Sequence, residues 1–219
     1  MRWKRTRQSH RARQDPAHRA TKQAELDLLE LAAASRDIDL FYLDEAGFSQ
    51  WSATGYSYFF VGEQKRLEQT KSRGRRVSIL GLWQPLESFT YGLSIGGFDS
   101  ESDIKMMDEQ ARQSAPVLQA TGRSRVIAQA NGPIHTSAAV QAKQPAWEAQ
   151  GLYLFFFAKY CAEMNPIELE WQHLKKAEIA GRMFEDELDL AYAVMNGVEA
   201  RAKVQGHTVE RFRFKAGST

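Results

Sequence analysis

The chain has 219 residues, of which 43% are hydrophobic and 26% charged, which is typical of one soluble globular domain with or without a tail. Its apolar runs are far shorter than the roughly 20 residues that span a bilayer, and no apolar segment follows the basic N-terminus, so we expect neither a membrane protein nor a signal peptide. The single cysteine, Cys161, excludes an intrachain disulfide and favours a reducing cytoplasm.

The net charge of +2 conceals a strong segregation of charge along the chain. The first fourteen residues contain no acid but six basic residues, namely Arg2, Lys4, Arg5, Arg7, Arg11 and Arg13. Such a segment can bind nucleic-acid phosphates through counterion release, although a solvated tail has the same composition. Apolar residues at helical spacing from Ala17 to Ser35 predict a helix that follows the arm. We therefore expect residues 1–36 to form a basic arm and linker helix.

Three β-rich segments follow the linker. Residues 38–44 are almost continuously apolar and end at Glu45-Ala46-Gly47, which is typical of a strand covered on both faces. Residues 76–83 and 89–95 are joined by a short connection and predict an antiparallel hairpin. The approach to this hairpin is basic, and we expect it to contact nucleic-acid phosphates through Arg73, Arg75 and Arg76.

The second half of the chain alternates helical and β patterns. Helices are predicted over 102–119, over 137–144 with a stop or kink at Pro145, over 166–181 and over 184–203, and strands over 126–128 and 152–157. The order of these elements combines a hairpin with parallel crossovers. We therefore expect an α/β fold over residues 37–205, with a five-stranded mixed sheet and helices on both faces, followed by a C-terminal tail at 206–219.

Two carboxylates lie where a strand and a helix could present them to a divalent metal ion. Asp44 ends the first strand, and carboxylate oxygens at strand ends are the hard ligands that Mg²⁺ prefers. Glu168 stands at the start of a helix, in Asn165-Pro166-Ile167-Glu168. Each residue also has a structural explanation, because Asp44 suits a turn before Gly47 and Glu168 suits a capping box. The residues alone leave both interpretations open.

A histidine and the single cysteine lie near these segments and could take part in chemistry there. His135 follows the fourth strand, where we expect it to cap the next helix or to bond the backbone, with an approach to a metal or phosphate as the alternative. Cys161 has no partner base evident in the sequence, so we do not expect it to act as a nucleophile.

Four blocks of sequence follow one another in an order that points to a known family: Asp44-Glu45-Ala46-Gly47-Phe48, then residues 72–76, 131–137 and 165–175. Together they resemble the catalytic domain of the insertion-sequence 630 family transposases, which are relatives of the mariner group. The resemblance covers nearly the whole chain. It implies a ribonuclease-H-like fold and a DDE triad of carboxylates that binds two Mg²⁺ or Mn²⁺ ions and cuts and rejoins transposon-end DNA.

Carried over residue by residue, the resemblance assigns the first Asp of the triad to Asp44 and the final Glu to Glu168, both as metal ligands. The middle Asp would directly precede Asn131, and this chain has Ala130 there. A methyl group cannot coordinate a metal ion, so we expect the loss to weaken activity at least about 10- to 100-fold. Gln129 is not expected to substitute, because neighbouring strand residues face opposite sides, and Asn131 would be a weaker, neutral ligand.

Two origins are consistent with Ala130: a deliberate inactivating substitution, or a decayed or repurposed transposase copy. Two functions also remain open. One is a DDE-type transposase catalytic domain for two-metal cleavage and strand transfer, impaired at Ala130. The other is a catalytically inactive, transposase-derived DNA-binding or regulatory protein. A hydrolytic ribonuclease of the same fold is a third alternative without a motif of its own.

The resemblance also implies partners and a location. Transposon-end DNA is the expected partner and a homodimer remains open, whereas no membrane and no small-molecule substrate are expected. Full-length relatives carry helix-turn-helix domains ahead of this region, so we expect specific recognition of transposon ends to be absent or supplied elsewhere. The expected location is the bacterial cytoplasm, at the nucleoid when DNA is bound.

Overall fold

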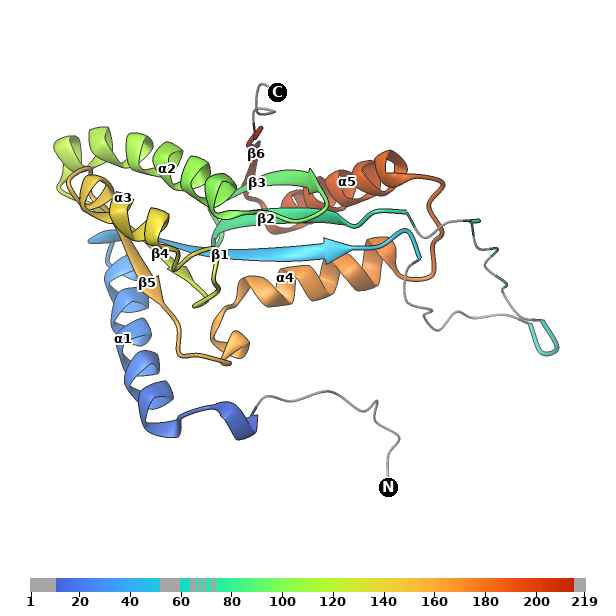
Figure 1. Ribbon diagram of the computed structural model, residues 1–219, viewed down its shortest axis with the longest axis horizontal. Coiled ribbons are helices and arrows are strands. Elements are labelled where there is room, and N and C mark those ends of the chain that lie inside the picture. Colours follow the sequence, from blue (N-terminus) through green and yellow to red (C-terminus); the bar gives the residue numbers. More distant parts are fainter. Residues whose placement is uncertain are drawn as a thin grey trace.

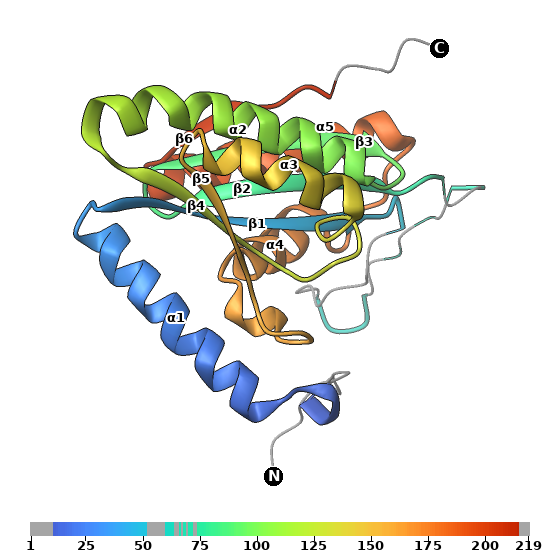
Figure 2. The ribbon, with the colours of Figure 1, turned by 60° about the vertical axis from the view of Figure 1, so that its left-hand side comes forward.

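The computed structural model describes residues 11–51, 60–63, 66, 68, 70–71 and 74–214. The centre of the fold is a six-stranded mixed sheet in the order β5-β4-β1-β2-β3-β6, with helices on both faces (Figures 1 and 2). The predicted α/β class and the two helical layers are confirmed, while the predicted count of five strands is one too low. No helix in the described ranges combines the length and the apolarity needed to cross a membrane.

Five of the strands lie close to their predicted positions. An antiparallel meander consists of β1 (Ile38–Phe48), β2 (Val77–Gln84) and β3 (Ser88–Ile95). On the other side of β1, strand β4 (Ser124–Gln129) pairs in parallel with β1, and β5 (Leu152–Phe156) pairs in parallel with β4. The long strand β1 therefore joins the antiparallel and parallel halves of the sheet.

The sixth strand lies in the segment that the sequence assigned to a C-terminal tail. Strand β6 (Thr208–Arg211) pairs in parallel with β3 at the edge of the sheet. Three of its four residues are exposed, and only Val209 is partly buried. Such a strand lacks the apolar alternation from which a strand is predicted, which explains why the sequence did not reveal it.

Two helical layers bury the two faces of the sheet in separate cores. One face packs against α1 (Pro16–Ala34), α4 (Ile167–Leu174) and α5 (Glu187–Gln205). The opposite face packs against α2 (Ser100–Thr121) and α3 (Ala138–Glu148). In Figure 1 α2 and α3 lie above the sheet and α4 lies below it. Alternate residues of the central strands therefore face different helical layers.

Two helices end at other residues than the sequence predicted. Helix α3 continues through Pro145 to Glu148. Beyond the proline, Trp147 is buried and its Nε1 donates a hydrogen bond to Asp108 of α2 at 2.8 Å. These contacts outweigh the cost of a proline inside a helix. The helix predicted over 166–181 consists instead of α4 and a following π-helical turn, η3 (Lys175–Ile179). Two 3-10 turns complete the described elements, η1 (Arg11–Arg13) and η2 (Ala162–Met164).

Candidate active site

Asp44 and Ala130 occupy equivalent positions just past the end of the parallel pairing between β1 and β4. Strand β1 itself continues to Phe48 through its pairing with β2, so the prediction that Asp44 ends the first strand, or starts a turn, is wrong. The pairing of β1 with β4 ends at Tyr42 and Ala128, and Asp44 and Ala130 each lie two residues further along their segments. Because strand side chains alternate, Asp44 faces the same side as Tyr42, which belongs to the core shared with α4. Asp44 and Ala130 line one cavity of about 370 Å³. We call this space the acidic cavity.

Gln129, the neighbour of Ala130, does not line the acidic cavity. It is fully buried, and among the described residues its side-chain amide has no hydrogen-bond partner. Its position agrees with the alternation from which we expected it to face away from the site. The chain therefore supplies no carboxamide from position 129 in place of the missing carboxylate.

Glu168 reaches the acidic cavity from the first turn of α4. The side chain of Asn165 anchors this end of the helix, because its Nδ2 donates to the carbonyl of Leu43 at 2.9 Å. The capping box that the sequence allowed is not formed, since the Asn165 N–H donates to the Ala162 carbonyl instead. The carboxylate of Glu168 is therefore not used to cap the helix and faces the cavity.

A tryptophan and a glycine, which the sequence did not single out for this purpose, hold Asp44 in place. Trp171 Nε1 donates a hydrogen bond to Asp44 Oδ2 at 2.9 Å. Gly81 pairs directly with Asp44 across β1 and β2, and a Cβ there would lie 2.5 Å from Trp171 Cη2. The glycine thus makes room for the indole ring. A glycine inside the apolar strand β2 was the available signal, because interior strand glycines often mark a close approach.

The two carboxylates share an environment that disfavours their charged forms. Burial, together with the nearby charge of Glu168, raises the pKa of Asp44 from 3.8 to about 7, although the hydrogen bonds from the Glu45 backbone and Trp171 lower it in part. Burial also raises the pKa of Glu168, and the charge of Lys175 opposes this shift. Such a pair is stabilised either by protons or by a cation.

The donor set of the acidic cavity fits a divalent cation held by two carboxylates. Asp44 and Glu168 offer hard oxygen ligands, and a bound cation would offset both the burial and the repulsion from Glu168 that raise the pKa of Asp44. Position 130 contributes only a methyl group to the same wall. Within the described ranges, no group of three His, Cys, Asp or Glu side chains is arranged to hold a metal ion.

The loop between β5 and α4 forms another wall of the acidic cavity and contacts the segment before α1. Gln14 Nε2 donates to the Tyr160 carbonyl at 2.8 Å and to Glu163 Oε1 at 3.0 Å. The Arg13 guanidinium lies 5.6 Å from the centre of the Tyr160 ring. Cys161 also lines the cavity, but burial raises the pKa of its thiol, which supports the expectation that it is no nucleophile.

Among the described residues, the side chain of His135 neither caps the following helix nor bonds the backbone, contrary to expectation. Its Nδ1 lies 3.0 Å from Oδ1 of Asp103, and both side chains are buried. The cap of α3 is Ser137. Asp103 lies on α2, 32 residues earlier, so no local pattern could have revealed this pair.

The predicted DNA-binding residues divide into two groups. Five of them lie outside the described residues, namely Arg2, Lys4, Arg5, Arg7 and Arg73. Arg75 contacts Glu187 of α5, through its backbone N–H at 2.9 Å and its Nε at 3.6 Å. Arg76 lines a cavity of about 520 Å³ that also includes Glu168, and its Nη2 lies 2.8 Å from Glu45 Oε1. Of the two predicted contacts that the structure describes, Arg76 is the one that lines a cavity together with Glu168.

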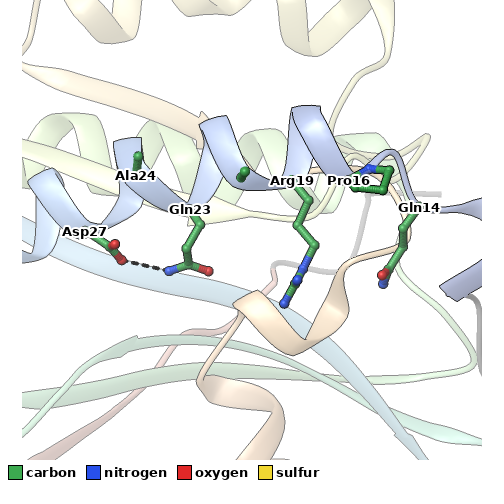
Figure 3. Close-up of a pocket in the computed structure, with 7 residues that line it drawn as sticks. Gln14, Pro16, Arg19, Gln23, Ala24 and Asp27 are labelled. Atoms are coloured by element: carbon green, nitrogen blue, oxygen red, sulfur yellow. Dashed lines mark hydrogen bonds between the residues drawn. The ribbon is translucent and has the colours of Figure 1, made fainter.

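A groove of about 480 Å³ runs along α1 but has no comparable chemistry. Figure 3 shows its lining side chains, which all come from α1 and the residues just before it: Gln14, Pro16, Arg19, Ala20, Gln23, Ala24 and Asp27. Gln23 and Asp27 are joined by a hydrogen bond of 2.8 Å. The groove contains one carboxylate, so the acidic cavity is the better candidate for an active site.

The solved structures that this chain resembles include those of Mos1 transposase. A pre-cleavage Mos1 transpososome is 14% identical with a TM-score of 0.62, over 94% of this chain and 65% of that chain. The mariner Mos1 paired-end complex with Mg is 14% identical with a TM-score of 0.63, over 92% and 60% of the two chains. The catalytic domain of Mos1 mariner transposase is 13% identical with a TM-score of 0.55, over 93% and 95%. These matches confirm the ribonuclease-H-like fold.

The chain thus spans about two thirds of the longer Mos1 chains and nearly all of the solved catalytic domain. No curated protein matches it. The narrower assignment to the insertion-sequence 630 group stays a prediction. Residues 39–191, well over half of the chain, match the family model described as DDE superfamily endonuclease. The chain therefore belongs to the DDE superfamily endonuclease family, on the fold of a mariner transposase catalytic domain.

Proposed function

We propose that this domain is a transposase catalytic domain for metal-dependent cleavage and strand transfer of transposon-end DNA, and that Ala130 impairs it. The observation that carries the proposal is the cavity shared by Asp44, Glu168 and Ala130. These residues come from three distant segments and correspond to the three triad positions that the sequence resemblance assigns. A purely structural role would not require the two acids to face one another at the cost of raised pKa values.

The chain's own side chains support a defined division of roles. Asp44 and Glu168 would hold a divalent cation, which when bound supplies charge stabilisation for an in-line displacement at phosphorus. Trp171 orients Asp44 through its hydrogen bond, and Asn165 fixes the helix end that carries Glu168. Mos1 paired-end complexes have been solved with Mn and with Mg, which supports these two ions as candidates here.

DNA is the proposed partner. The Mos1 matches include a paired-end complex with the left transposon end and a strand transfer complex. In this chain Arg13, the last basic residue of the arm, lies beside Tyr160 at the wall of the acidic cavity. This contact supports an arm that meets DNA close to the carboxylates. A homodimer, the bacterial nucleoid as location, and the domain limits at residues 36 and 205 stay predictions.

The alternative function is a catalytically inactive DNA-binding or regulatory protein derived from a transposase. The observation in its favour is the methyl group of Ala130 on the wall where the third carboxylate is expected. Loss of one ligand weakens the cation site while leaving the fold and the basic arm intact. Binding without cleavage is the behaviour that this alternative requires.

Restoring the third carboxylate tests the proposal. Ala130→Asp is expected to increase Mn²⁺- or Mg²⁺-dependent nicking of DNA that carries the element's terminal repeats by at least about 10- to 100-fold, because a carboxylate that can bind the cation directly is restored to the cavity. Ala130→Asn is the matched control, with nearly the same size and no charge. Adding Glu168→Gln to the revertant should remove the nicking again.

The outcomes separate the two functions. A folded revertant that binds Mn²⁺ by calorimetry but nicks no faster than the parent contradicts the catalytic proposal. Salt-dependent DNA binding by the parent, lost when the arm's arginines are neutralised, would then favour the inactive binding protein.

A further inference from the structure

We infer that the outer face of helix α1 binds the same face of a second copy of this chain, with the two helices antiparallel. The face consists of two alanines and two leucines, all of them exposed, namely Ala17, Ala24, Leu28 and Leu31. We call these four residues the apolar stripe. The inference goes beyond the proposed function, because such an assembly requires neither a cation nor cleavage of DNA.

The apolar stripe lies on the side of α1 that is turned away from the sheet. Leu26 marks the inner side of the helix, because it is buried in the core. Glu30 lies on the same inner side and accepts a hydrogen bond from Tyr42 of β1. At about 3.6 residues per turn, all four residues of the stripe lie within roughly 40° of the direction opposite Leu26. In Figures 1 and 2 α1 lies at the outside of the fold, so this face is open to a partner.

The two leucines of the stripe are largely exposed. Leu28 is 67% and Leu31 64% exposed, and they lie one helical turn apart. Single exposed leucines are common on protein surfaces. Here, however, the residues of the stripe follow one another at intervals of seven, four and three, which is the heptad spacing with which one helix packs against another. The groove along α1 borders the stripe and shares Ala24 with it (Figure 3).

The side-chain volumes of the stripe are complementary when α1 pairs with an antiparallel copy of itself. A two-fold axis beside Ala24 brings Ala24 of both copies together and places Ala17 of each copy opposite Leu31 of the other. Leu28 then faces Ala20 of the other copy. Each large side chain thus meets a small one, as interdigitating layers require. A parallel pair would place alanine against alanine along the first half of the helix and leave that half loosely packed.

The charges of α1 are also arranged for antiparallel pairing. The first half of the helix carries its basic residues and the second half its acidic ones: His18, Arg19 and Lys22, then Glu25, Asp27 and Glu30. An antiparallel pair places the basic half of each copy beside the acidic half of the other, and it aligns the two helix dipoles favourably. Arg19 and Lys22 already have acidic partners in their own chain. The pattern therefore selects the direction of pairing more than it adds affinity.

Sedimentation velocity of the full chain, from about 1 to 200 µM with EDTA and a reducing agent, tests whether the stripe joins two copies. We expect a dissociation constant on the order of 10 µM, because α1 has 19 residues and is only about 28 Å long. Leu28→Gln should weaken dimerisation at least about 10-fold, since it removes one apolar side chain from each side of the interface. Leu188→Gln is the matched control, because Leu188 is 60% exposed on α5, and it should stay within about twofold of the parent.

Cysteine cross-linking tests the direction of pairing. Ala24→Cys should form a disulfide between two copies under mild oxidation, because residue 24 lies beside the two-fold axis. Ala17→Cys should not, because in an antiparallel pair the two copies of residue 17 are about 21 Å apart along the helices, beyond the reach of a disulfide. The native Cys161 is buried, so the parent chain reports the background of cross-linking.

Three outcomes would overturn the inference. A parent that stays monomeric at about 200 µM would leave the stripe to another occupant, such as residues 1–10 of the same chain. Equal losses for Leu28→Gln and Leu188→Gln would place the interface elsewhere, and cross-linking of Ala17→Cys as readily as Ala24→Cys would contradict the antiparallel arrangement. Circular dichroism checks that each variant keeps its helices, which substitution at exposed positions permits. None of these measurements uses DNA, so their failure is distinct from failure of the proposed function.

Discussion

The carboxyl group of Asp44 permits a quantitative test of the electrostatics of the acidic cavity. Burial and Glu168 raise its pKa from 3.8 to about 7 in the folded protein. Between these values the folded state binds more protons than the unfolded chain, so the free energy of unfolding falls as the pH rises from about 4 to about 7. With about 1.36 kcal/mol for each pKa unit, the full loss is about 4 kcal/mol.

Asp44→Asn removes the charge and keeps the shape of the side chain. The amide oxygen can still accept the hydrogen bond from Trp171 Nε1. We therefore expect this variant to raise the free energy of unfolding by about 4 kcal/mol at pH 8 but by only about 0.5 kcal/mol at pH 4. For a chain of this length the gain at pH 8 corresponds to a rise in Tm of about 8 to 16 °C.

Urea denaturation of parent and variant at both pH values, with EDTA present, measures this difference. Asp99→Asn is a suitable control, because Asp99 is an exposed helix cap whose pKa is lowered by its hydrogen bonds to Ser102. This control should not stabilise the protein at pH 8. An equal gain for Asp44→Asn at both pH values, or no gain at pH 8, would refute the reasoning.

Two further substitutions test the groups that position the carboxylates. Gly81→Ala should destabilise the fold by about 1–3 kcal/mol and change the tryptophan fluorescence, because its Cβ would lie 2.5 Å from Trp171 Cη2. Gly97→Ala, with open space around its Cβ, is the control, and equal effects would disprove a steric cause. Asn165→Ala should cost about 1–3 kcal/mol in urea denaturation, because it leaves the buried carbonyl of Leu43 without its donor. An unchanged midpoint would show that this bond does not stabilise the helix end.

The sequence predicted those parts of the fold that depend on local patterns. The apolar runs of β1, β2 and β3 and the helical spacing of α1 and α2 were sufficient to place these elements. The edge strand β6 was missed because its exposed residues carry no apolar pattern. Helix α3 continues beyond Pro145 because the buried Trp147 is bonded to Asp108 of α2. A contact between residues so far apart in the sequence cannot be predicted from local patterns.

For the candidate site, the sequence predicted positions but not contacts. The resemblance selected Asp44, Ala130 and Glu168, and all three line one cavity. The hydrogen bond from Trp171 to Asp44 joins residues 127 positions apart, which no spacing rule can foresee. Asp103 was likewise unforeseen as the partner of His135. Which residues bind metal and DNA stays a prediction.

The repulsion between the carboxylates of the acidic cavity also bears on how stable the protein is in the cell. Asp44 and Glu168 already oppose each other without a cation, and a third carboxylate at position 130 would face both. An alanine at position 130 therefore avoids the repulsion that a third carboxylate would add. Cellular quality control acts on the unfolded fraction of a protein, not on its turnover of substrate. A chain with alanine at position 130 is therefore expected to have a smaller unfolded fraction, and slower degradation, than the same chain with aspartate there.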